Sequence, residues 1–209
     1  DNKSKNIVTL SNSVGYNAWT AIVGNRLIPG FPGAGGNIDT DILDGQFSKK
    51  VQGSIFGEIN GERTERIEQL ARVFESAHLP YMISENIRAF HLSHAAFAAA
   101  IKHFYTPTGM MDTKTAKRGE VLRKVASGIK QNVHLLHLAG IPVLDPKLKA
   151  AGKLPEWVIA AVFRMMLSMK FTRSVLLGSH ALSAREETMQ MDRAFTEMKC
   201  LCYNDKKMC

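Results

Sequence analysis

The chain has 209 residues, of which 45% are hydrophobic and 22% charged, and its formal net charge is +8. This length can bury a full core and fits one large or two small domains, and the composition is that of a globular protein. The longest apolar run, Trp157 to Phe163, is too short to span a bilayer, and the first five residues lack the apolar stretch of a secretory signal. We therefore expect a cytoplasmic protein without a membrane partner.

The positive charge is placed unevenly along the chain. Residues 1–84 carry 8 basic and 9 acidic residues, whereas residues 85–209 carry 19 basic and 10 acidic residues. Such a field favours anionic partners, although solvated helix faces produce the same excess. Nucleic acid is not expected as a partner, because no basic block is interleaved with aromatic residues and no binding motif is present.

The first part of the chain has alternating strand and helix patterns. The expected strands are 6–10, 26–31, 54–58 and 81–84, and the expected helices are 16–23 and 62–77. Their order begins with the β-loop-α-β succession of a parallel sheet. Residues 1–84 are therefore predicted to form one α/β domain.

The remaining chain has the pattern of a helical bundle. Its expected helices are 87–105, 113–139, 155–171 and 174–199, so residues 85–199 form the second predicted domain. The third of these helices is apolar on every face between residues 157 and 163, which predicts a central position in the bundle. Three cysteines fall within residues 200–209, an odd number at one end of the chain, and this segment is expected to be a tail without a metal site.

Five segments, taken in order, carry a resemblance to a known family. They are the turn 12–15 (Asn-Ser-Val-Gly), the strand 27–33 with the following Ala-Gly-Gly, the strand 54–58 (Ser-Ile-Phe-Gly-Glu), the helix 62–77 and the helix entry 84–88 (Ser-Glu-Asn-Ile-Arg). Their order and spacing resemble the ketopantoate reductase (2-dehydropantoate 2-reductase) family, as a divergent member. The resemblance implies a partial Rossmann-like α/β sheet followed by a helical domain of the 6-phosphogluconate-dehydrogenase C-terminal type.

The resemblance also implies a function. Family members reduce a small 2-keto acid to the 2-hydroxy acid with NADPH, so NADP(H) is the expected cofactor. The G-x-G-x-x-G segment that forms the first half of a dinucleotide-binding domain is not found in this sequence, and we expect this chain alone to bind the cofactor weakly or not at all. The alternative function is a non-catalytic dimerisation or partner-binding module that keeps the reductase fold.

Site residues follow from the same resemblance. Asn12 matches a family asparagine at the carboxyl end of a strand, where open α/β sheets place ligands. Glu187 resembles a glutamate late in the helical domain, and Glu186 is the other possible register. Gly33 and Ala34 belong to a segment that forms either a tight turn beside the substrate or, less in keeping with the sequence around it, a phosphate cradle.

Three positions depart from the family pattern, and one of them is Ala98, which stands where the family has an asparagine. His94 stands where the family has its catalytic lysine, and Lys102 stands at a position where the family has an asparagine. Histidine can donate a proton in place of lysine, so His94 is a candidate catalytic residue, and a purely structural histidine is the alternative. Lys102 is expected to contact substrate or cofactor. His134 and His137 lie in an apolar run and are expected in the core.

Finally, the predicted sheet has an edge that needs a partner. An unpaired strand edge is a hazard that proteins normally cover or pair. We therefore expect a homo-oligomer, or pairing through residues 6–31.

Overall fold

The computed structural model describes residues 4–12, 14–39, 42–47, 53–177 and 184–204. The chain divides into two compact units, residues 1–91 and residues 92–209. The expected boundary between residues 84 and 85 differs from this division because the first turns of the following helix, with Ile87 and His91, are buried in the first unit.

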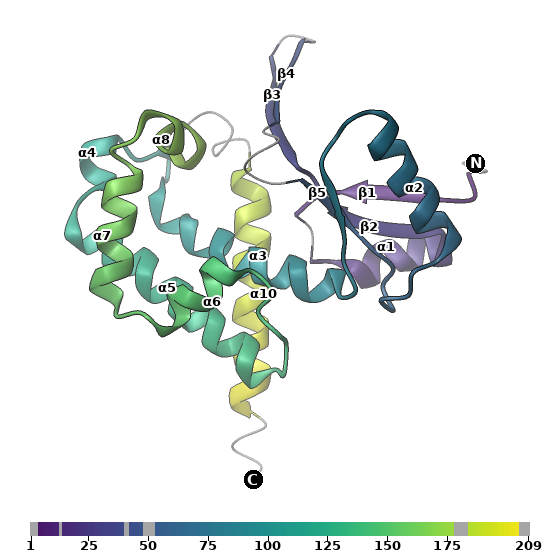
Figure 1. Cartoon of the computed structure of the whole chain (residues 1–209). Helices are drawn as coiled ribbons and strands as arrows, with labels where there is room; N and C mark the ends of the chain where they lie inside the picture. Colours follow the sequence, from purple (N-terminus) through teal and green to yellow (C-terminus); the bar gives the residue numbers. More distant parts are fainter. Residues whose placement is uncertain (1–3, 13, 40–41, 48–52, 178–183, 205–209) are drawn as a thin grey trace. The chain divides into compact units, whose positions relative to one another are not determined.

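The first unit contains a four-stranded sheet (Figure 1). Its strands are β1 (Ile7–Leu10), β2 (Leu27–Phe31), β5 (Ser54–Phe56) and β6 (Tyr81–Ile83), in the order β1-β2-β5-β6. The outer pairs are parallel, whereas β2 and β5 are antiparallel. The sheet is therefore mixed rather than parallel throughout.

A hairpin accounts for the antiparallel pair. Strands β3 (Ala34–Asp39) and β4 (Ile42–Phe47) lie between β2 and β5 in the sequence. They pair with each other and form a separate two-stranded sheet. Parallel neighbours need a crossover of a dozen or more residues, usually a helix, and such helices do join β1 to β2 and β5 to β6. Because the β2–β5 connection is a hairpin instead, β5 pairs with β2 in the opposite direction.

Helices cover both faces of this sheet. Helix α2 (Glu65–Ser76) buries Ile67, Ala71 and Phe74 against Ile28 and Phe56. On the other face, α1 (Tyr16–Val23) and the following 3-10 turn η1 (Gly24–Arg26) contribute Tyr16, which packs with Phe31, Ile55 and Ile87. The spacing of three and four residues between the apolar positions of α2 explains why the sequence predicted its buried stripe.

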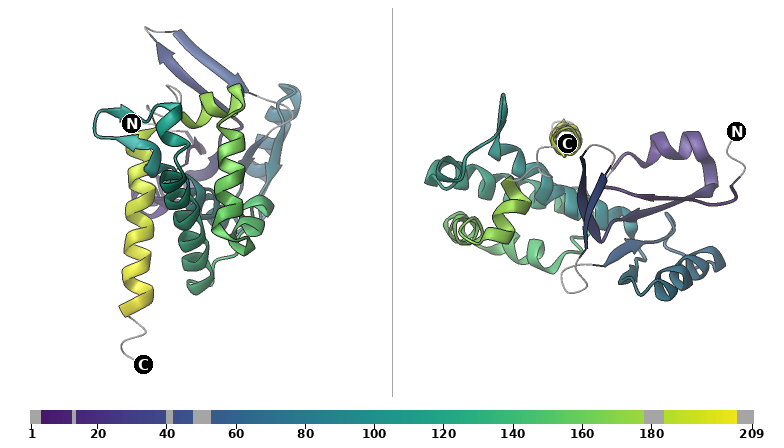
Figure 2. Two further views of the ribbon diagram at one scale, coloured as in Figure 1. Left: turned by 90° about the vertical axis from the view of Figure 1, so that its left-hand side faces the viewer. Right: turned by 90° about the horizontal axis from the view of Figure 1, so that it is seen from above.

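The second unit is helical. Its elements are α3 (Ile87–Ala100), which begins in the first unit, η2 (Ile101–Phe104), α4 (Thr113–Ala116), α5 (Gly119–Leu138), α6 (Pro146–Lys153), α7 (Glu156–Met166), α8 (Lys170–Leu177) and α10 (Arg185–Asn204). A two-residue ladder joins β7 (Tyr105–Thr106) to β8 (Gly109–Met110). Helix α5 packs against α6, α7 and α10 (Figure 2). None of the described helices is long and apolar enough to cross a membrane.

Three features of this unit differ from the sequence prediction. Helix α5 buries Ile129, Val133 and Leu136 on one side, so His134 and His137 point to the other side and are exposed rather than in the core. Helix α7 is not central, because Trp157 is 72% exposed. Helix α10 runs through Cys200 and Cys202, so the described part of the expected tail is helical; Cys209 lies outside the described residues.

A polar cavity in the helical unit as the candidate functional site

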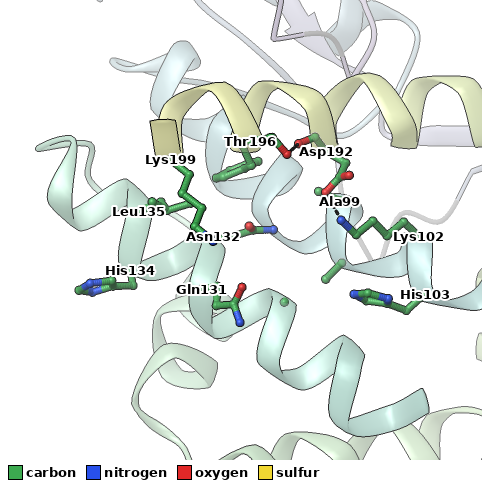
Figure 3. A pocket seen from close by; sticks show the side chains of 13 residues that line it. Ala99, Lys102, His103, Gln131, Asn132, His134, Leu135, Asp192, Thr196 and Lys199 are labelled. Carbon is green, nitrogen blue, oxygen red and sulfur yellow. Dashed lines mark hydrogen bonds and ion pairs between the residues drawn. The ribbon is translucent and has the colours of Figure 1, made fainter. Parts of the chain in front are cut away.

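A cavity of about 460 Å³ lies between the end of α3, η2, α5 and α10 (Figure 3). Its polar lining comes from three separate stretches of the chain. These residues are Lys102, His103, Gln131, Asn132, His134, Asp192, Thr196 and Lys199. The volume falls in the range of about 300–1,000 Å³ that small-molecule sites occupy.

The room for this cavity comes from small residues where α3 meets α5. Ala99 and Ala100 line it from α3, and Gly128 lines it from α5. A Cβ atom on Gly128 would lie 3.3 Å from the Cβ of Ala100 and 3.8 Å from Nε2 of His103. The two helices therefore approach closely at Gly128 while the longer side chains diverge around the cavity.

One ion pair spans the cavity wall. Lys102 Nζ donates to Asp192 Oδ1 at 2.5 Å, and the two side chains are 33% and 26% exposed. The pair joins η2 to α10 across ninety positions of the chain. Asp192 is the only acidic residue that lines the cavity among the described residues, and it neutralises one of the two lysines.

The second lysine leaves the cavity positive. Lys199 points from α10 toward the space beside Asn132 (Figure 3), and it has no carboxylate partner among the described residues. Burial and the neighbouring Lys102 lower the pKa of His103, so its imidazole is neutral near pH 7 and can donate or accept a hydrogen bond. The cavity thus offers one unneutralised ammonium group and several neutral hydrogen-bonding groups.

The neutral polar groups come from α5 and α10. Asn132 Nδ2 donates to the backbone oxygen of Ala96 at 3.0 Å, which fixes the amide and leaves its other donor and its oxygen for further hydrogen bonds. Thr196 Oγ1 donates to the backbone oxygen of Asp192 at 2.9 Å. This arrangement suits a small anion that also carries a polar group such as a carbonyl or hydroxyl.

The structure places Lys102, but not the other expected residues of this unit, at the cavity. His94 lies two turns earlier on α3, is half-buried and does not line it. Glu187 lies in the first turn of α10, where its charge raises the pKa of nearby Tyr105 to a minor degree beside the larger effect of burial. Tyr105 also contacts Thr188, with 3.3 Å between the two hydroxyl oxygens.

The remaining expected residues belong to the first unit. Asn12 is half-buried and lies two residues after the end of β1. The backbone N–H of Gly33 donates to Ser54 Oγ at 2.9 Å. Ala34 begins β3, whose glycines pair with β4, so this segment is an extended strand and its backbone N–H groups do not form a phosphate cradle.

Sequence reasoning missed one buried pair in the first unit. The Tyr16 hydroxyl and Nδ1 of His91 form a hydrogen bond, and both residues are buried. Burial lowers the pKa of His91 to about 4, an effect partly offset by the nearby carbonyls of Gly30 and Ser11, and burial also raises the pKa of Tyr16. Both groups are therefore neutral at pH 7, and the pair fixes α1 against the start of α3.

A dinucleotide-binding sheet holds the pyrophosphate at the turn between a strand and a helix. The β1–α1 turn ends at Gly15, whose φ of −86° is not the left-handed conformation of a phosphate-binding glycine turn. The β5–α2 turn has a left-handed Gly61 but is flanked by Glu58, Glu62 and Glu65, and these carboxylates line a second cavity and oppose phosphate. These two turns, as far as they are described, therefore do not fit a dinucleotide pyrophosphate site. The described residues contain no group of three or more histidine, cysteine or acidic residues that could hold a metal ion.

The fold is a helix-covered sheet followed along the chain by a helical unit. A solved structure of 2-dehydropantoate 2-reductase from Methylococcus capsulatus matches it with a TM-score of 0.54 and 20% sequence identity, over 96% of this chain and 71% of that chain. The chain therefore has a ketopantoate reductase-like fold, and at this identity the likeness shows the fold alone. No protein-family model matches the sequence, and the comparison with curated proteins gives no match.

Proposed function

We propose that this chain is the substrate-binding part of a reductase that acts on a small 2-keto acid. The cavity that contains Lys102 and Lys199 carries the proposal, because a 2-keto acid combines a carboxylate with a neighbouring carbonyl oxygen. In this proposal the ammonium group of Lys199 pairs with the carboxylate, and Lys102 and Asn132 are within the cavity to donate to the carboxylate or the carbonyl. The reductase-like fold supports the reaction class.

Lys102 connects the family resemblance with the cavity. The family resemblance placed this residue at a substrate-contacting position, and in the structure its side chain lines the cavity. Its ion pair with Asp192 holds the side chain at the cavity wall.

Binding is tested by calorimetric titration of the whole chain with a branched 2-keto acid such as 2-ketoisovalerate. We expect a dissociation constant of about 0.1–1 mM, because a single exposed lysine and a few neutral donors give only modest affinity. The methyl ester of the same acid is the matched ligand control and should not bind, since it lacks the charge.

Variants then assign the binding to the cavity. Lys199→Met and Lys102→Met should each weaken binding at least tenfold, whereas Lys124→Met, which removes an exposed ion pair with Glu120 on α5, should not change it. Equal binding of acid and ester, or unchanged affinity in Lys199→Met, would show that the cavity is not the keto-acid site.

Reduction of the bound acid needs a hydride donor, for which the resemblance implies NADP(H). We propose that a further βαβ unit supplies its site by pairing with the edge strand β1, where Val8 is 38% and Leu10 42% exposed. His94, Asn12 and Glu187 do not line this cavity, so their roles stay predictions from the family resemblance. The chain alone should neither bind NADPH in calorimetry nor oxidise it in the presence of the keto acid; micromolar affinity would overturn the placement of the cofactor site in a further unit.

A further inference from the structure

One face of α7 is apolar and exposed on the helical unit. Trp157 is 72% exposed and Met165 is 60% exposed, and Ala161 lies midway between them at steps of four residues. The opposite face carries the buried Ile159 and Phe163, with the ring of Phe163 stacked on Phe97 at a centroid distance of 5.9 Å. Helix α7 therefore has two apolar faces, and the described residues cover only one of them.

The exposed area of this face can be compared with the area of a protein interface. Three further exposed apolar side chains lie near it along the chain, Val162 within α7 and Leu154 and Met169 just outside its two ends. Together the six side chains expose roughly 500 Å², within the range of about 300–600 Å² of the largest apolar patch on a typical monomer, which is often functional. If an identical patch covers it, roughly 1,000 Å² is buried in total, which reaches the lower bound for a specific interface.

The order of side-chain sizes along this face is self-complementary. A two-fold interface places the same patch against itself, so each residue must fit the residue related to it by symmetry. With Ala161 on the axis and the helices antiparallel, Ala161 meets its own copy and lets the backbones approach closely. Trp157 then lies against the partner subunit's Met165 at both ends, a contact between an aromatic ring and a polarisable sulfur.

The charges next to this face agree with the same arrangement. Trp157, Ala161 and Met165 carry no charge, and a charged residue near their stripe is Arg164, seven residues after Trp157. Arg164 lies beside the stripe, is exposed and has no ion-pair partner among the described residues. In the antiparallel pair its guanidinium falls at the rim near the partner subunit's Trp157, where a cation–π contact can form.

We propose that a second copy of this chain docks on this face, with the two α7 helices packed antiparallel about a two-fold axis through Ala161. The inference does not rest on the proposed keto-acid function, because α7 contributes no residue to the cavity.

Sedimentation equilibrium of the whole chain tests the assembly. We expect a monomer–dimer equilibrium with a micromolar dissociation constant, given an interface near the lower size limit. Trp157→Glu and Met165→Glu should each weaken dimerisation at least tenfold. Val73→Glu is the matched control, because Val73 is also 60% exposed but lies on α2 in the first unit, and it should leave the equilibrium unchanged.

Cross-linking at position 161 tests where the two-fold axis lies. In a background with Cys200, Cys202 and Cys209 replaced by serine, Ala161→Cys should form an intermolecular disulfide rapidly under mild oxidation, whereas the exposed Ala150→Cys on α6 should not. A chain that stays monomeric up to hundreds of micromolar, a dimer that survives Met165→Glu, or equal cross-linking at both positions would overturn the proposal. Binding of the monomer to lipid vesicles through the same face would also overturn it.

Discussion

Lys102 Nζ lies 2.5 Å from Asp192 Oδ1, so the cavity contains an internal carboxylate that competes with any anionic ligand for the lysine. This relationship has a testable consequence for binding. When Asp192 is replaced by asparagine, Lys102 loses its ion pair and the cavity gains one unit of positive charge.

Asp192→Asn should therefore strengthen binding of a 2-keto acid severalfold, opposite in direction to Lys102→Met. The expected loss of stability is about 0.5–1 kcal/mol, because both partners are partly exposed and such pairs contribute little. Calorimetric titration measures the affinity, and urea denaturation measures the stability. Affinity that falls in Asp192→Asn would mean that the aspartate, rather than the lysine, contacts the ligand.

His103 gives the cavity a pH dependence. In the chain without a ligand, burial and Lys102 lower the pKa of His103, so its imidazole is neutral near pH 7. A bound carboxylate favours the protonated form and raises this pKa, so binding takes up a proton and becomes stronger as the pH falls from about 7. Affinity measured between pH 8 and pH 5.5 should rise toward the acid end for the native chain and stay nearly flat for His103→Gln.

The sequence could predict the elements but not the cavity. The strands and α2 follow from local apolar spacing, and Lys102 was found because the family resemblance marks its position. The other lining residues, among them Gly128, Asn132 and Lys199, come from helices far apart in the chain. Which of their faces meet is decided by tertiary packing, and one sequence carries no direct signal of it.

The exposed histidines of α5 illustrate the same limit. An apolar run around His134 and His137 predicted burial, yet a helix 20 residues long can bury only the side that faces its neighbours. Likewise α7 has apolar residues on every face, which indicated a central helix, but the described residues cover only one side of it. Apolar composition therefore fixes which residues can be buried, and the packing of α5 and α7 decides which of them are.

A buried carboxylate stabilises the first unit. Glu58 accepts two hydrogen bonds from Arg66, of which the bond from Nε to Oε1 is 2.6 Å long. It accepts a third from Thr64 Oγ1 at 2.6 Å. Arg66 Nη1 also donates to the backbone oxygen of Asn25 at 2.6 Å. The Arg66 guanidinium, together with Thr64, lowers the pKa of Glu58 although burial opposes this. The carboxylate therefore contributes stability above its unfolded pKa of about 4.3, and this stability is lost as the pH falls through the folded value.

Glu58→Gln should lower the free energy of unfolding by about 3 kcal/mol, because it leaves a partly buried guanidinium without its counter-charge. Glu68→Gln is the matched control: Glu68 pairs with Arg63 at the surface, where solvent screens the pair, and its loss should cost much less. Urea denaturation at pH 7 compares the two variants. Equal losses would mean that the Glu58–Arg66 pair behaves as a surface pair despite its burial.

The Tyr16–His91 pair should give the first unit a second acid sensitivity. The pKa of His91 is about 4 in the folded chain and about 6.5 when unfolded, so between these values the unfolded state binds more protons. Stability therefore falls as the pH drops from 6.5 to 4, by an amount on the order of 3 kcal/mol.

His91→Gln should flatten this part of the stability profile, measured by urea denaturation between pH 7 and pH 4. Tyr16→Phe tests the hydrogen bond separately: it leaves Nδ1 of the buried His91 without its hydrogen-bond partner and should cost about 1–3 kcal/mol at pH 7. The imidazole resonances of His91 should show the neutral ring down to about pH 5 in the folded chain, because its pKa lies near 4. A ring that titrates near pH 6.5 would mean that water reaches His91 and that the Tyr16–His91 pair does not hold α1 against the start of α3.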